Sequence, residues 1–469
     1  IQFTLDNAAV FHGDLKIAAA MGGFLFGYDE AVVSGTISDV AAQFQLNAMD
    51  KGWFVGSALV GAIVGVLFGG VLGDKAGRKN TMILSAVLFC VSMIGCALAS
   101  SFFALVSYRI IGGVGIGVAS IVCPLYISEI SVPERRGLLV SLYQLAVTIG
   151  VVGAYVVNNY LLIFSQSGAE LGESLNRIFI SEAWRGMLGM GFLPSFIFLA
   201  VVLFIPESPR WLITQDRLSR AGDIFSKIYT DKTEIQRQIA ATREVMATTA
   251  GEESEFKLLL QPGIFKALLI GVAIAILGQF MGVNAVLYYG PEIFKDAGLP
   301  SDDALFYQVL VGLANMITTV LAMFIIDRVG RKALVYYGVS GMIVSLLLIA
   351  FYFTWGASLG LSSIFLLVFF MLYIVCCAGS ICAVVWVILS EMYPIKVRAV
   401  AMSVAGLSLW IGTYLIGQLT PWLLENITPA GTFLLFAAMC VPYMLIMWRL
   451  VPETTGKSLE EIEQYWTKK

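Results

Sequence analysis

The sequence predicts an all-α membrane protein whose twelve transmembrane helices form two pseudo-symmetric six-helix bundles joined by a helical linker. Long apolar runs, the polar bursts that separate them and an internal repeat are the three observations behind this prediction. Hydrophobic residues make up 58% of the 469 residues and charged residues only 13%, whereas soluble domains carry about 25% charged residues. The formal net charge of −3 is too small to indicate a nucleic-acid partner.

The apolar runs are long enough to cross a bilayer. A hydrocarbon core of about 30 Å requires about 20 mostly apolar residues in a helix. Runs of this kind occupy 15–36, 52–73, 81–100, 103–127, 138–163, 186–205, 264–289, 304–326, 334–354, 361–389, 399–422 and 431–450.

The longest polar interruption lies between the sixth and seventh spans and is expected to form short amphipathic helices at the membrane surface. It divides the spans six and six. The predicted parts are an N-terminal six-helix bundle (1–206), a cytoplasmic helical linker (207–261), a C-terminal six-helix bundle (262–452) and a cytoplasmic tail (453–469).

Lysine and arginine indicate the sidedness of the spans. They collect in the loops after even-numbered spans, as Lys75, Arg78 and Lys79, then Arg135 and Arg136, then Arg328, Arg331 and Lys332, and finally Lys396 and Arg398. Cytoplasmic loops carry such an excess. Both termini are therefore expected in the cytoplasm, with the protein in the plasma (inner) membrane.

Three short motifs recur in the second half of the chain at nearly one separation. Gly73–Lys79 recurs as Ile326–Lys332, the Glu129 and Arg136 pair recurs as Glu391 and Arg398, and Pro206-Glu207-Ser208 recurs as Pro452-Glu453-Thr454. Each copy falls at the cytoplasmic end of the corresponding helix. Two parallel halves of this kind are related by an axis along the membrane normal, and a substrate site is expected where they meet.

Charged residues within the spans indicate a coupling site. Asp29 and Glu30 lie in the first span and Arg109 in the fourth, where a charged group costs about 2.5–3.5 kcal/mol. Burial favours the neutral form of the Asp29 carboxyl, and a nearby Arg109 favours the carboxylate. If the halves tilt and this distance changes, the carboxyl takes up or releases a proton. The alternative is a permanent Asp29–Arg109 pair that only stabilises packing. The sequence assigns no role to Glu30.

These motifs resemble those of the sugar porter family of the major facilitator superfamily, over nearly the whole chain. The resemblance is strongest to the bacterial proton-coupled monosaccharide symporters of the xylose type. It implies the major facilitator fold, and it implies proton coupling at Asp29, because related proton symporters carry Asp there and passive animal glucose carriers carry Asn. The residues that carry it are Gly27-Tyr28-Asp29, Asp74–Lys79, Tyr108-Arg109, Glu129 with Arg136, Pro206–Trp211, Gln279 with Asn284, Asp327–Lys332, Glu391 with Arg398, and Pro452-Glu453-Thr454.

Amide side chains suit a sugar, because they donate and accept hydrogen bonds without carrying charge. Each sugar hydroxyl that is left without a partner costs about 1–3 kcal/mol. By resemblance, the candidate sugar contacts are Gln144, Gln279, Asn284, Asn315 and Trp386. The alternative is that the amides hydrogen-bond neighbouring helices, which is a common use of such residues in membranes.

The chain departs from the family at four of the positions near this site. Gly278 replaces the first residue of a Gln pair, Cys382 and Ala383 replace a Gly-Pro, and Leu409 replaces a Gln. The identity of the sugar, xylose or a related pentose or hexose, is therefore open. Loss of the Gly-Pro is expected to remove a helix breaker from the tenth span.

Paired acids and bases at the cytoplasmic helix ends are expected to link the helices of the two halves when the inner side is shut, and to act as a gate that opens when these links break. The alternative, positive-inside topology alone, explains the bases but not the acids. The candidate gate residues are Asp74, Arg78, Glu129, Arg136, Glu207, Asp327, Arg331, Glu391, Arg398 and Glu453.

The predicted function is proton-coupled monosaccharide symport by alternating access. A passive sugar uniporter and a non-transporting sugar receptor are the alternatives. An enzyme is not expected, since neither a nucleophile–base constellation nor a metal-ligand cluster is found, and the cysteines lack metal-site spacing. The expected partners are a small sugar and the lipid bilayer, with the proton as the coupling ion, no other cofactor, and a functional monomer.

Overall fold

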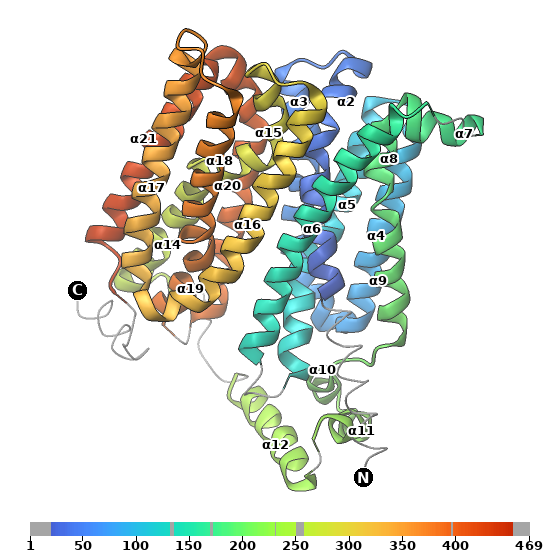
Figure 1. The fold of residues 1–469 in the computed structure, drawn as a ribbon. Helices are drawn as coiled ribbons and strands as arrows, with labels where there is room; N and C mark the ends of the chain where they lie inside the picture. The colour runs from blue at the N-terminus through green and yellow to red at the C-terminus, as the bar shows by residue number, and fades with distance from the viewer. Residues whose placement is uncertain are drawn as a thin grey trace. The chain divides into compact units, whose positions relative to one another are not determined.

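The computed structural model describes residues 20–131, 136–168, 172–229, 231–249, 258–394 and 397–453. Regular structure in these ranges is helical (Figure 1). Eleven segments there are long and apolar enough to cross a membrane. In chain order they are α3 (Ala48–Ala76), α4 (Arg78–Leu98), α5 (Phe102–Ile130), α6 (Arg136–Ser165), α8 (Ala183–Gly189) with α9 (Phe192–Phe204), α14 (Pro262–Phe280) with α15 (Val283–Asp296), α16 (Ser301–Val329), α17 (Arg331–Phe351), α18 (Ser363–Ala378) with α19 (Ile381–Met392), α20 (Arg398–Asn426) and α21 (Thr428–Arg449).

Eleven of the twelve predicted spans are confirmed by these segments. The first predicted span begins before the described residues, which are helical over 20–32. The remaining elements are short. They are η1 (Val33–Gly35), α2 (Ile37–Phe44), α7 (Glu173–Asn176), the π-turns η3 (Arg177–Ser181) and η4 (Tyr352–Gly356), and the linker helices α10 (Pro209–Thr214), α11 (Leu218–Ile228) and α12 (Lys232–Thr249).

The repeated motif predicted from the sequence has the same backbone geometry in both copies. Gly77 ends α3 and precedes Arg78 of α4 with φ 94° and ψ 157°. Gly330 ends α16 and precedes Arg331 of α17 with φ 91° and ψ 153°. Only glycine adopts this region without strain. The motif therefore places an arginine at the first position of the next helix in each half.

The described residues fall into two compact units. The first comprises those within 1–29, 60–151 and 188–252, and the second those within 30–59, 152–187 and 253–469. The boundaries cut through α3 and α6, so the units differ from the division at 206 and 262, which stays a prediction.

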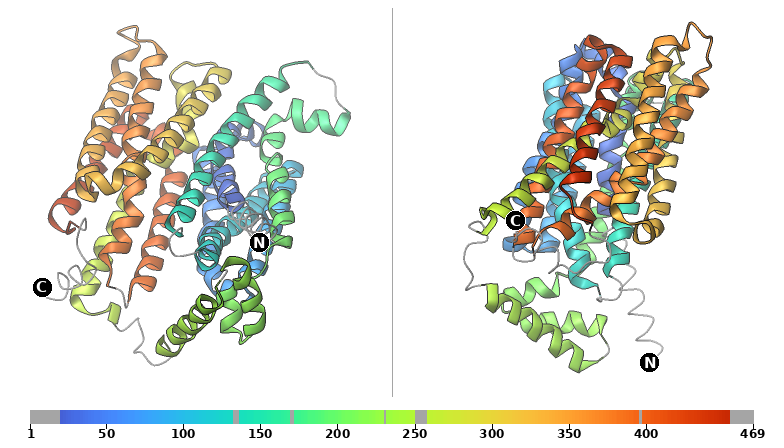
Figure 2. Two further views of the ribbon diagram at one scale, coloured as in Figure 1. Left: turned by 60° about the horizontal axis from the view of Figure 1, so that its bottom comes forward. Right: turned by 90° about the vertical axis from the view of Figure 1, so that its left-hand side faces the viewer.

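In the first unit α4 packs along α5 and α9. The linker helices α10, α11 and α12 pack on one another (Figure 2). Their shared core contains Trp211, Ala221, Phe225 and Ile235. The Trp211 indole Nε1 donates to the Asp74 carbonyl at 2.7 Å, which attaches the linker to the end of α3.

In the second unit α14 packs on α20 and α21, and α17 packs on α18 and α21 (Figure 1). Two first-half elements, η1 and α2, contact α15 in the same unit. This unit therefore contains the second half of the chain together with segments of the first half.

The tenth predicted span is helical at Cys382 and Ala383, where the family has Gly-Pro, but it is interrupted just before them. The break falls at Gly379 and Ser380, between α18 and α19. The Ser380 hydroxyl donates to the Cys376 carbonyl at 2.5 Å, and Ser380 leaves helical geometry with ψ −85°. The hydroxyl therefore satisfies a backbone carbonyl next to the break, a bond that serine also makes within unbroken helices.

Candidate functional site

Asp29 and Arg109 form a buried ion pair in the first unit. Arg109 Nη1 lies 3.2 Å from Asp29 Oδ1 and also donates to the Asp29 carbonyl at 3.4 Å. Each residue is 2% exposed. The structure therefore brings together the two residues that the sequence analysis selected for proton coupling.

Small side chains surround the carboxyl group of Asp29. A Cβ at Gly112 of α5 would come within 2.4 Å of the Ser92 hydroxyl and within 3.9 Å of Asp29 Oδ2. Among the described residues, Oδ2 has no hydrogen-bond partner. A buried oxygen without a partner raises the free energy of the carboxylate. This oxygen is therefore available to hold a proton.

An amide cluster lies in the second unit, where the seventh span is interrupted at Met281 and Gly282. The Asn284 amide donates to Gln279 Oε1 at 2.8 Å. The break depends on Gly282, which has φ +91° and whose Cβ would clash with Phe436 at 2.3 Å. Discontinuous helices of this kind form the substrate sites of many transporters.

Thr413 of α20 is a member of the amide cluster that sequence reasoning missed. Its hydroxyl donates to Gln279 Oε1 at 3.2 Å. Thr413 lies one helical turn after Leu409, so both point to the same side of α20. A polar residue one turn from a missing family amide is the signal that could have found it.

The other predicted sugar contacts do not join this cluster. Gln144 is exposed on α6 in the first unit, and Asn315 is half-buried on α16. Trp386 is 42% exposed, and its ring lies 3.5 Å from where a Cβ at Gly406 would be. A Cβ at Gly278 would meet only apolar atoms of Ile381 and Tyr443.

The first set of predicted gate residues forms one network within the first unit. Arg78 Nη2 lies 2.9 Å from Glu129 Oε1, and its Nη1 lies 2.9 Å from Asp74 Oδ1. The Ser208 hydroxyl donates to Glu129 Oε2 at 2.5 Å. Glu207 accepts from the backbone N–H groups of Arg78 at 2.9 Å and of the next residue at 3.0 Å. Glu207 thereby caps the N-terminus of α4, where a negative charge is stabilising.

The second set lies in the second unit. Arg331 Nη2 lies 3.0 Å from Glu391 Oε1. Arg398 donates to the Tyr393 carbonyl at 3.2 Å, and Glu453 makes a further interaction. These bonds of both sets, among the described residues, join residues of the same half of the chain. The side chains of Arg136 and Asp327 lie outside the described residues.

The buried network predicts a difference in stability. Glu129→Ala would leave the Arg78 guanidinium with Asp74 and the Gly73 carbonyl, and breaking a buried pair costs about 3 kcal/mol. As a matched control, Arg243→Ala breaks the exposed pair of Arg243 with Asp216, which is worth about 0.5 kcal/mol. Thermal unfolding of the purified proteins in detergent measures both. Equal losses of Tm would contradict the structural role of the network.

A set of contacts between the two halves of the chain also lies in the second unit, and sequence reasoning did not predict it. We call these contacts the seam. In three of them, the Tyr288 hydroxyl donates to the Glu30 carboxylate, Tyr155 donates to the Leu287 carbonyl at 2.8 Å and Gln418 donates to the Met49 carbonyl at 2.9 Å. In the other two, Lys295 donates to the Ser38 hydroxyl at 3.1 Å and Lys51 pairs with Glu292 at 3.8 Å. The one signal in the sequence was Glu30, an acid in a predicted span.

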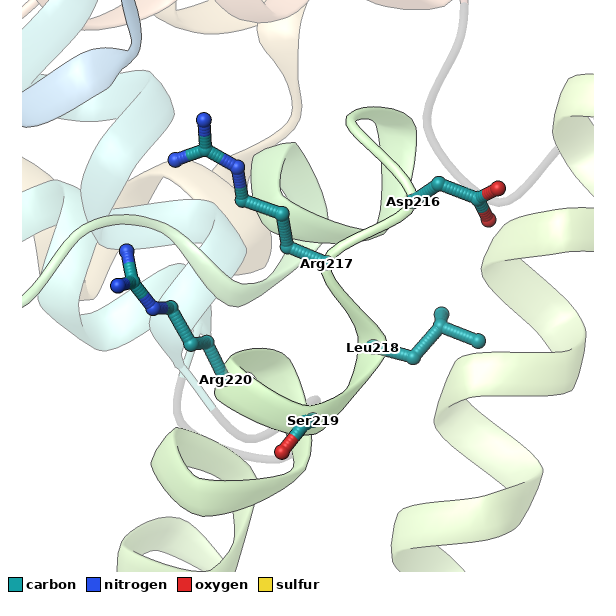
Figure 3. A pocket seen from close by; sticks show the side chains of 5 residues that line it. All are labelled: Asp216, Arg217, Leu218, Ser219 and Arg220. Carbon is teal, nitrogen blue, oxygen red and sulfur yellow. The ribbon is translucent and has the colours of Figure 1, made fainter.

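A pocket of about 520 Å³ lies in the linker and is lined by residues 216–220. Arg217 and Arg220 point to one side of it, and Asp216 points away (Figure 3). Asp216 is bound to Arg243 of α12 at 3.0 Å. The lining has no amide or aromatic side chain, so it lacks the groups that suit a neutral sugar.

Comparisons with known proteins place this geometry in a family. The profile of the "Sugar (and other) transporter" family matches residues 15–466. The arabinose-proton symporter of Bacillus subtilis (strain 168) is 36% identical over 97% of this chain and 95% of its own length. The D-xylose-proton symporter of Escherichia coli (strain K12) is 33% identical over 96% and 95%.

A solved structure has the same fold. The xylose transporter XylE from E. coli, in a partially occluded inward open conformation, superposes with a TM-score of 0.82 at 31% identity, over 96% of this chain and 100% of that chain. The family profile, the two relatives and this structure all cover nearly the whole chain. The chain is therefore a multi-pass membrane protein with the major facilitator fold and belongs to the sugar (and other) transporter family.

Proposed function

We propose that this protein is a proton-coupled monosaccharide symporter that works by alternating access. The observation that carries the proposal is the buried Asp29 carboxylate, which pairs with Arg109 through Oδ1 at 3.2 Å while Oδ2 has no hydrogen-bond partner among the described residues. Two relatives with similarity over the whole chain are named as proton symporters of arabinose and xylose. The proton is the coupling ion, and Asp29 carries it.

The sugar binds at the amide cluster and, by resemblance, at the other candidate contacts. Gln279, Asn284 and Thr413 supply a shared acceptor and two donors, which exchange their bonds with one another for bonds to sugar hydroxyls. Gln144, Asn315 and Trp386 complete the site by resemblance. The apolar environment of Gly278 and the side chain of Leu409 favour a sugar with fewer polar contacts than the family pattern provides.

The sidedness follows from the charge of the loops. Both termini and the gate residues lie on the cytoplasmic side of the plasma membrane, and the two six-helix bundles divide at the linker. Lys51 and Lys295 lie after the first and seventh spans, so the seam is on the outer side. The seam holds the outer side shut. The gate networks, whose bonds form within each half, stabilise the helix ends on the inner side. The protein acts as a monomer.

Sugar-driven proton uptake tests the proposal. Adding a transported sugar to weakly buffered proteoliposomes that contain the protein is expected to raise the external pH, because each sugar enters with a proton. A panel of pentoses, hexoses and polyols identifies the substrate. Sugar entry without any change of pH would favour the passive uniporter, and sugar binding without entry would favour a receptor.

A further inference from the structure

Glu30 is a second acid in the first helix, and the proposed coupling step does not use it. It directly follows Asp29, and consecutive residues of a helix point about 100° apart. Asp29 pairs with Arg109, whereas the Glu30 carboxylate accepts a hydrogen bond from the Tyr288 hydroxyl of α15. Tyr288 is 1% exposed and Glu30 is half-buried. Asp29, the proposed proton carrier, is therefore directly followed in the chain by a residue that accepts a hydrogen bond across the seam.

Tyr288 lies on the same side of α15 as the amide cluster. Asn284 precedes it by four residues, and residues with this spacing share a helix face. On α20, Thr413 bonds to Gln279, and Gly417 one turn later faces Tyr288, because its Cβ would lie 3.8 Å from the tyrosine ring. Asn284 and Tyr288 thus lie on neighbouring turns of α15, and Thr413 and Gly417 lie on neighbouring turns of α20.

Neighbouring residues hold the backbone of α15 through neutral bonds. Tyr155 of α6 donates to the Leu287 carbonyl at 2.8 Å, and Gln308 of α16 donates to the same carbonyl at 3.1 Å. The bond from Tyr288 to Glu30 differs from these two because its acceptor is a carboxyl group, and a carboxylate accepts charge-assisted hydrogen bonds that are roughly twice as strong as neutral ones. It also joins α15 to the first helix, which carries Asp29.

We propose that Glu30 is a positioning residue. Its hydrogen bond with Tyr288, which we call the latch, holds α15 against the first helix and keeps the seam closed over the amide cluster. When this bond breaks, the turn of α15 that follows Asn284 can move, and the contacts of the seam can separate. A carboxylate at this position holds the closed seam more firmly than a neutral side chain does. The inference rests on the proposed function, because it assigns the step that admits sugar.

Labelling of a buried seam position tests the latch. Val55 is 2% exposed, and its side chain lies 3.6 Å from where a Cβ at Gly417 would be, so Val55→Cys reacts with a polar maleimide only when the seam opens. In nanodiscs, Glu30→Gln and Tyr288→Phe are each expected to raise the labelling rate about tenfold, the effect of losing one hydrogen bond to a charged group. The protein without Val55→Cys supplies the background from its seven native cysteines.

The double variant separates a shared bond from two independent effects. If Glu30 and Tyr288 act through one bond, Glu30→Gln with Tyr288→Phe labels no faster than either single variant. Glu173→Gln removes an exposed acid in the first turn of α7 and is the matched control, expected to label at the unaltered rate. Unaltered labelling in both single variants, or a double variant with multiplied effects, would overturn the latch.

The labelling assay and the proton-uptake assay can fail separately. Tyr288→Phe removes a single hydroxyl, so it keeps the test usable if Glu30→Gln does not give monodisperse protein. Increased labelling in a protein whose wild type shows no sugar-driven proton uptake would refute the proposed symport and leave the latch standing. Proton uptake in the wild type together with unaltered labelling in the variants would refute the latch alone.

Discussion

Asp29→Asn protein is expected to exchange sugar across a membrane but not to accumulate it against a gradient. Asn has the shape of Asp but cannot carry a proton, and its oxygen can still accept from Arg109, which also bonds the residue-29 carbonyl at 3.4 Å. The fold and the sugar site are therefore retained, while the coupling to the proton gradient is lost.

The size of the loss follows from the driving force. One charge crossing 100 mV gains about 2.3 kcal/mol, which corresponds to roughly 50-fold accumulation for one proton per sugar. In proteoliposomes with an imposed potential, the accumulation ratio is expected to fall from this level to about one in Asp29→Asn. Counterflow exchange of labelled sugar, measured without a gradient, is expected to persist.

Asp303→Asn is the matched control, because it makes the same chemical change at an exposed position in the first turn of α16. It is expected to accumulate sugar as the unaltered protein does. Uphill accumulation that survives in Asp29→Asn would show that the Asp29–Arg109 pair only stabilises packing, as in the alternative of a passive carrier.

Gln279→Ala is expected to weaken sugar binding by roughly 5- to 150-fold, which corresponds to about 1–3 kcal/mol for polar groups left without a partner. The Gln279 oxygen is the shared acceptor of Asn284 and Thr413. Its removal therefore takes one amide from the sugar and disturbs the orientation of two other polar groups. Isothermal titration with xylose, arabinose and glucose measures the change in Kd.

The same variant separates the two uses of the amides. If they only bond neighbouring helices, Gln279→Ala lowers the Tm and leaves the Kd of the transported sugar unaltered. Gln215→Ala, at an exposed linker position, controls for loss of an amide elsewhere. An unaltered Kd in Gln279→Ala would refute the assignment of the cluster to the sugar site.

Much of the fold could be predicted because the physical forces involved are local to a segment. Lipid exposure requires about 20 apolar residues in a helix, so hydropathy alone located the eleven segments that the structure confirms. The repeated motif was expected at the ends of corresponding helices, and the glycine in both copies has the same positive φ between two helices. The Asp29–Arg109 pair could also be predicted, because a buried charge requires a partner and few candidates lie in the spans.

The interruptions of the spans were less predictable. Hydropathy does not distinguish one long helix from two helices joined at Met281 and Gly282, since both segments are apolar. At the break the Ser380 hydroxyl bonds the Cys376 carbonyl, and a Ser in an apolar run makes such bonds in unbroken helices too.

The sequence by itself determined which segments cross the membrane, that they form two related halves, and which buried charges require partners. Only the tertiary structure decided that Thr413 bonds Gln279, that Glu30 bonds Tyr288, and that Arg78 and Arg331 pair with acids of their own half. The reason is geometric. Hydropathy is a property of each residue, whereas the partner of a polar side chain depends on how each helix is rotated and which distant helix packs against it.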